Sequence, residues 1–162
     1  MSKFSTSEID NNTDILDSRE IQERLDYLTD EIQSALESSG RDETDFSTLA
    51  EDHTPEDLER IIDRLINREL LESSVWDEWS IIRETFDGVK DCSEWKFGMT
   101  FLRESYVDED WAENECKGMG LIPNDLPFFI ESNIDWDGVK DDLLQDYTSL
   151  DFDGVKYYYR EY

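Results

Sequence analysis

Two segments of the chain carry oxygen side chains at the spacing of a calcium-binding loop. The first matches positions one, three, five and six of an EF-hand loop with Asn133, Asp135, Asp137 and Gly138. Position twelve of such a loop needs a bidentate glutamate. That position is Leu144 in the first segment and Arg160 in the second, which spans 149–160. Both segments lack the residue that closes the ion's coordination shell, so we expect a capped helix and a tight turn with no bound metal.

Other reactive residue types are too few or too common to indicate a reaction. The cysteines, Cys92 and Cys116, stand alone, and the one histidine is His53. They do not supply the four cysteine or histidine ligands of a structural zinc site. Phosphate-binding glycine loops and nucleophile motifs are absent from the sequence. Carboxylates are so numerous that no acid–base pair can be singled out, so we expect no enzyme activity and no cofactor.

Net charge is the outlying property of the sequence. Asp and Glu total 43 against 15 Lys and Arg, which gives a formal charge of −28 over 162 residues. The acids are spread along the whole chain rather than gathered in a tail. Duplex DNA would repel such a chain, so we expect no direct binding to nucleic acid. The sequence has no apolar run of the roughly 18 residues that a membrane span needs and no signal-peptide pattern, so we expect a cytoplasmic protein without a membrane anchor.

The same charge could attract a protein whose groove normally binds DNA. Duplex DNA carries one charge per ~1.7 Å of axis, so 28 charges correspond to roughly 14 base pairs. Carboxylates three and four residues apart on a helix lie about 5–6 Å apart, close to the spacing of phosphates along a strand. The acids expected to form such rows are Glu20, Glu23, Asp26, Asp30, Asp57, Asp63, Asp108, Glu109, Asp110, Glu113, Asp137, Asp141 and Asp142. The plainer interpretation is an acidic surface that only confers solubility.

Helical periodicity dominates the first half of the chain. Residues 17–40 place Ile21, Leu25, Leu28, Ile32 and Leu36 on a narrow apolar seam, typical of a helical hairpin or a coiled coil. A second helix is predicted to begin after an N-cap at 54, to run through 73 and to continue toward 86. The two helices are expected to pack as an antiparallel hairpin. The seam could instead form a homodimer.

The second half mixes short helices with extended segments. The spacing predicts an extended segment ending near 107, a short helix over 108–120, a loop with a short extended stretch over 121–134, and a helix after Asp135. Two alternating runs joined by Asp153–Gly154 predict a β-hairpin over 149–160. We therefore predict an α+β fold with a flexible N-terminus at 1–16 and a helical hairpin region at 17–86. A small domain at 87–162 follows, with short helices and a short antiparallel sheet that ends in the C-terminal hairpin.

The C-terminal half resembles a known group of proteins. The runs "GMTFLRESYVDEDWAENECKGMG" at 98–120 and "IDWDGVKDDLLQDYTSLDFDGVKYYYR" at 134–160, with Asp17–Ser18–Arg19 near the N-terminus, resemble small acidic proteins of phages, prophages and plasmids. Some of these are similar to ArdA-type antirestriction proteins, acidic DNA mimics that occupy the DNA site of restriction–modification enzymes. The resemblance implies an anti-defence protein in the host cytoplasm, but it transfers no site residue.

Two functions follow as expectations. In the first, a mobile element encodes a DNA mimic that occupies the basic groove of a restriction or CRISPR-type enzyme of the host. In the second, the chain is an acidic adaptor that binds a partner through its N-terminal helical hairpin. Salt should weaken the first kind of binding far more than the second.

Overall fold

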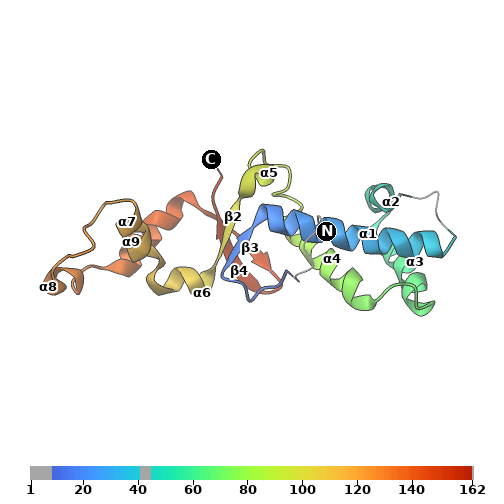
Figure 1. Ribbon diagram of the computed structural model, residues 1–162, viewed down its shortest axis with the longest axis horizontal. Helices are drawn as coiled ribbons and strands as arrows, with labels where there is room; N and C mark the ends of the chain where they lie inside the picture. The colour runs from blue at the N-terminus through green and yellow to red at the C-terminus, as the bar shows by residue number, and fades with distance from the viewer. Residues whose placement is uncertain (1–8, 41–44, 162) are drawn as a thin grey trace. The chain divides into compact units, whose positions relative to one another are not determined.

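The computed structural model describes residues 9–40 and 45–161 (Figure 1). The described chain divides into two compact units. Unit 1 holds residues 9–10, 19–40 and 45–91, and unit 2 holds 11–18 and 92–161. The predicted boundary at 86/87 is therefore placed between Asp91 and Cys92, and a short N-terminal segment joins the C-terminal unit.

Unit 1 is made of four helices, α1 (Ser18–Ser38), α2 (Phe46–Asp52), α3 (Pro55–Asn67) and α4 (Ser73–Phe86). The five seam residues of α1 are all buried, with exposed fractions from 0% to 5%. Trp79 of α4 donates its indole N–H to Thr29 Oγ1 at 3.2 Å, and the backbone N–H of Phe46 donates to Gln33 Oε1 at 2.7 Å. The seam is thus buried within a small helical core. A homodimer through these side chains would require them to leave that core, so their burial does not support the prediction of a dimer through the seam.

The second predicted helix is two helices. Thr54 caps α3 as predicted, because its hydroxyl accepts the N–H of Asp57 at 3.2 Å. The helix ends at Asn67, and Glu69 adopts a left-handed backbone with φ 60°. The N–H of Leu70 then bonds to the carbonyl of Leu65 at 2.9 Å, which closes the end of the helix. A glutamate carries no local signal for this conformation, so apolar periodicity alone predicted continuation.

Unit 2 is built on a four-stranded antiparallel sheet. Its strands are β1 (Ile15–Asp17), β2 (Thr100–Arg103), β3 (Thr148–Phe152) and β4 (Val155–Tyr159), in the order β1-β2-β4-β3. The predicted hairpin is confirmed as β3 and β4. Asp153 and Gly154 both have positive φ, 51° and 84°, as a two-residue turn between right-twisted strands requires. The α+β fold class predicted from the sequence is confirmed.

The predicted flexible N-terminus is wrong from Ile9 onward, while residues 1–8 lie outside the described chain. Ile9 and Leu16 are buried, and β1 pairs with β2. Tyr157 donates its hydroxyl to the carbonyl of Thr13 at 2.6 Å. Three residues of strand are too short to stand out in the sequence, and the partner strand lies more than eighty residues away.

Besides the sheet, unit 2 contains short helices. They are α5 (Trp95–Gly98), α6 (Glu104–Tyr106), η1 (Val107–Trp111), α7 (Ala112–Gly118), α8 (Phe128–Glu131), α9 (Trp136–Leu143) and η2 (Leu144–Asp146). Val107 and Trp111 are buried together with Leu102, and the half-buried Trp136 and Tyr147 pack against them. Two predictions need correction: the extended segment ends at Arg103, not near 107, and residues 128–131 form a helical turn.

Candidate partner-binding surfaces

The predicted acidic residues divide between the two units, and each unit is described by itself. Unit 1 carries Glu20, Glu23, Asp26 and Asp30 on α1 and Asp57 and Asp63 on α3. All are exposed except Asp26, which is half-buried and accepts a hydrogen bond from Gln22 at 2.8 Å. Because the helical period is 3.6 residues, Glu23, Asp26 and Asp30 share the side of α1 opposite its buried seam. Because the seam packs into the core, the opposite side of α1, which carries this row, faces away from the core.

Three of the predicted acids in unit 2 gather around one lysine. Lys140 of α9 donates to Asp108 Oδ1 of η1 at 2.9 Å. That hydrogen bond raises the pKa of Lys140, and the charges of Asp108, Asp137 and Asp141 raise it further. One lysine does not neutralise three carboxylates, so the group keeps a negative net charge. We call these three acids and Lys140 the Lys140 cluster.

A second lysine lies between two glutamates. Lys117 Nζ is 2.9 Å from Glu113 Oε1 within α7 and 3.1 Å from Glu131 Oε1 at the end of α8. Hydrogen bonds to Glu113 and Glu131 raise the pKa of Lys117. The hydrogen bond with Glu131, followed by that with Lys117, lowers the pKa of the Glu113 carboxyl group. The bridge therefore fastens α8 to α7, and Glu113 has a structural task as well as its predicted place in the acidic surface.

The remaining predicted acids of unit 2 are Glu109, Asp110 and Asp142, which are all exposed. Glu109 and Asp110 lie where η1 leaves helical geometry, with ψ of −128° at Glu109. The sequence missed the two lysines and Glu131 as members of this surface. The Glu113–Lys117 spacing of four residues was visible as a helical pair, whereas nothing local connects Glu131 to a lysine fourteen residues before it.

The residues that suggested a calcium loop have structural tasks. Asp135 caps α9 by accepting the N–H of Gly138 at 3.1 Å, which confirms the predicted capped helix. Asn133 donates its side-chain amide to the carbonyl of Phe129 at 2.6 Å. Asp151 accepts the N–H of Gly154 at 2.8 Å in the hairpin turn. Within 9–40 and 45–161, no three Asp, Glu, His or Cys side chains are arranged so that they could hold a metal ion.

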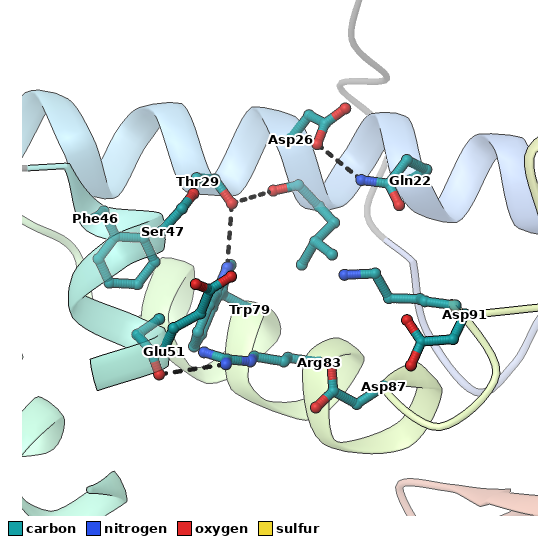
Figure 2. Close-up of a pocket in the computed structure, with 13 residues that line it drawn as sticks. Gln22, Asp26, Thr29, Phe46, Ser47, Glu51, Trp79, Arg83, Asp87 and Asp91 are labelled. Atoms are coloured by element: carbon teal, nitrogen blue, oxygen red, sulfur yellow. Dashed lines mark hydrogen bonds between the residues drawn. The ribbon is translucent and has the colours of Figure 1, made fainter. Parts of the chain in front are cut away.

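A cavity of about 390 Å³ opens between α1, α2 and α4 in unit 1 (Figure 2). Trp79 forms part of its wall, and Asp26, Glu51, Asp87 and Asp91 supply carboxylates. An aromatic wall with an acidic lining suits a cation. Here the chain supplies that cation itself: the Arg83 guanidinium lies 5.0 Å over the Trp79 ring and donates to the carbonyl of Ala50 at 3.3 Å. The cavity is open, and cationic Arg83 and Lys90 line it together with the carboxylates.

Exposed apolar side chains gather in one segment of unit 2. Among the described residues, five of the seven large hydrophobic side chains that are exposed fall within 119–130. We call them the apolar tip: Met119 (54% exposed), Leu121 (66%), Phe128 (83%), Phe129 (70%) and Ile130 (44%). Within unit 2, α8 lies at the end away from the sheet (Figure 1). The sequence analysis predicted a loop here because of the two prolines. It did not predict that the consecutive aromatic residues would be exposed.

Comparisons with protein-family models, curated proteins and solved structures give no match for this chain. No helix of the described residues is both long and apolar enough to cross a membrane.

Proposed function

We propose that the chain is a non-enzymatic inhibitor encoded by a mobile element. It acts in the host cytoplasm as an acidic DNA mimic and occupies the basic groove of a restriction or CRISPR-type enzyme. The observation that carries the proposal is the display of the acids: eleven of the thirteen predicted carboxylate residues are exposed, and the other two are half-buried. With 43 acids against 15 bases, the surface has a strong negative field at neutral pH.

The acids are held in place rather than left on free chain ends. The α1 row is fixed by the buried seam, and the Lys140 cluster is fixed by the packing of Trp136 and Val139 of α9 against Val107 and Trp111. A fixed array of charges costs less conformational entropy on binding than a disordered acidic tail would. This favours the mimic over a surface that only confers solubility.

The alternative is an adaptor that binds through the N-terminal helices. Such binding needs an exposed apolar face on those helices, and the seam of α1 that would provide it is buried. The observed exposure of charge therefore favours mimicry.

The experiment is a DNA-cleavage assay with a panel of purified restriction enzymes and an RNA-guided nuclease. We expect inhibition of at least one enzyme, weaker inhibition as salt rises, and relief by excess duplex DNA. The triple variant Glu109→Gln, Asp110→Asn, Asp142→Asn takes the charge from −28 to −25 (−28 + 3). It should raise the inhibitor concentration needed for half inhibition.

A matched control separates position from total charge. Glu31→Gln, Asp52→Asn, Glu84→Gln also gives −25 and changes three exposed residues outside the predicted rows. Equal loss in both triple variants would show that the layout of the acids is irrelevant. Inhibition of no enzyme, or inhibition unaffected by salt and DNA, would refute the mimic.

A further inference from the structure

The apolar tip exposes five large hydrophobic side chains within twelve residues. Phe128 and Phe129 are among its most exposed side chains, at 83% and 70%. The core of unit 2 is formed by other aromatics, including Trp111 at 3% exposure. Apolar surface of this kind on a soluble chain marks an interaction site, and aromatic residues supply much of the energy at such sites.

The backbone that carries the tip is held at both ends. On one side, the N–H of Leu121 bonds to the carbonyl of Cys116 at 2.9 Å. On the other, Lys117 bridges to Glu131, and the Asn133 amide holds the carbonyl of Phe129. The two rings are thus presented on a braced turn, α8, which lowers the entropy lost when they bind.

The negative charge of the chain favours some binding partners for the tip over others. A second copy of the chain brings another formal charge of −28, so association of two copies is opposed by repulsion. An anionic lipid surface is opposed for the same reason. Asp125 lies within the segment and Asp135 and Asp137 follow it, all three exposed, so the tip has acidic neighbours in the sequence. The complementary partner is an apolar surface with cationic neighbours.

We infer that the apolar tip docks on a protein groove in which aromatic side chains, flanked by lysine and arginine, stack on unpaired bases. This inference rests on the proposed function and deepens it: the carboxylates replace phosphates, and Phe128 and Phe129 replace bases. Grooves that bind single strands combine a cationic track with aromatic platforms, and they accept any flat ring because the stacking is independent of base identity. The partner class is therefore a protein that handles unpaired or flipped bases, rather than one that contacts only the backbone of a duplex.

The test uses two synthetic nonapeptides of equal charge, three Lys-Trp-Lys repeats and three Lys-Ser-Lys repeats. Each is titrated into the isotopically labelled chain, and amide shifts are followed by NMR. We expect the tryptophan peptide to bind about fivefold or more tightly and to shift the signals of 119–131. The serine peptide should shift only signals near the acidic residues. Equal affinities, or no shift in 119–131, would overturn the inference.

Two variants make the result specific. Phe128→Ser with Phe129→Ser should abolish the preference for tryptophan and leave the binding of the serine peptide unchanged. Phe97→Ser removes an equally exposed ring (73%) outside the tip and should keep the preference. Loss of the preference in Phe97→Ser would refute a role specific to the tip. If the serine peptide fails to bind, the charge proposal fails and this inference fails with it; if only the preference for tryptophan is missing, this inference alone fails.

The other occupants are tested directly. The chain is mixed with neutral phosphatidylcholine vesicles and, separately, examined by sedimentation up to high concentration. We expect neither vesicle binding nor dimers. Vesicle binding or dimer formation that the double serine variant abolishes would assign the tip to a lipid surface or to a second copy, and would overturn the docking inference.

Discussion

The seam of α1 and the apolar tip are both apolar, but the seam is buried and the tip is exposed. The seam lies on a long helix, and unit 1 buries all five of its side chains to 5% exposure or less. The tip lies on a four-residue helix and a loop, and its side chains are 44–83% exposed. Both segments carry large apolar side chains, so apolar character alone does not separate a core segment from a docking segment. The presence of covering elements in the same chain separates them.

Acidic residues, in contrast, look alike in both units. They cover α1 and α3 in unit 1 and η1 and α9 in unit 2, and most are exposed in each. Charge alone therefore does not locate a contact in either unit. The apolar tip is found in one unit only among the described residues, so it could supply the specificity that a uniform field lacks.

The largest expected effect comes from opening the core beneath the seam. Ile32 is fully buried, and Ile32→Ala should lower the free energy of unfolding of unit 1 by about 2–5 kcal/mol, since a cavity adds to the lost burial. Trp76 and Trp79 lie in unit 1 but the other three tryptophans lie in unit 2, so the change is measured by amide hydrogen exchange of α1 rather than by fluorescence. A loss below 1 kcal/mol would mean that the seam is not the core we describe.

A smaller loss is expected from the ion pair between α1 and α4. Arg24 bonds to both carboxylate oxygens of Glu78, at 2.5 and 2.7 Å, and each side chain is 11% exposed. Glu78→Gln should cost about 1–3 kcal/mol because it weakens charged hydrogen bonds in a nearly dry site. The exposed pair of Asp57 and Arg60, 3.6 Å apart, is the control, and Asp57→Asn should cost less than about 1 kcal/mol. Similar losses in the two variants would argue against burial as the cause.

Alkaline pH should weaken unit 2 through its sheet. Burial raises the pKa of Tyr158 above its ordinary value of 10.0, opposed by Lys156 and assisted by Glu104. The folded phenol therefore keeps its proton above pH 10 while the unfolded one loses it, so the free energy of unfolding falls as pH rises through this range. Tyr158→Phe should flatten that fall in denaturant titrations between pH 9 and 11. An unchanged slope would assign the loss to other groups.

The smallest effect on stability is expected at the apolar tip. Phe128→Ser and Phe129→Ser should each change the free energy of unfolding by less than about 0.5 kcal/mol, because exposed side chains lose little contact when truncated. Unfolding followed by circular dichroism checks this. A loss above 1 kcal/mol would show that the rings contribute to the fold, and the contrast with the seam would no longer hold.

Local patterns predicted much of this fold. The seam, the Thr54 and Asp135 caps and the Asp153–Gly154 turn each depend on residues within a few positions, and the structure has them all. The features that were missed depend on distant partners or on solvent. Strand β1 forms because residues such as Leu16 pair with β2, here with Phe101. Glu131 forms an ion pair with Lys117 across a loop. Exposure of Phe128 follows from the lack of a covering element in the described chain, which no window of sequence reveals.

The placement of β1 bears on the order in which the protein forms. Residues 11–18 belong to unit 2, and Ser18 is fastened there because its N–H and hydroxyl bond to the carbonyls of Met99 and Trp95. Residues 19–91 of unit 1 are interposed between that strand and the rest of its sheet. On the ribosome, residues 19–91 emerge before β2, so the helices of unit 1 can assemble while β1 still lacks its partner strand. Pairing β1 with β2 across this intervening segment adds loop-closure entropy to the formation of the sheet.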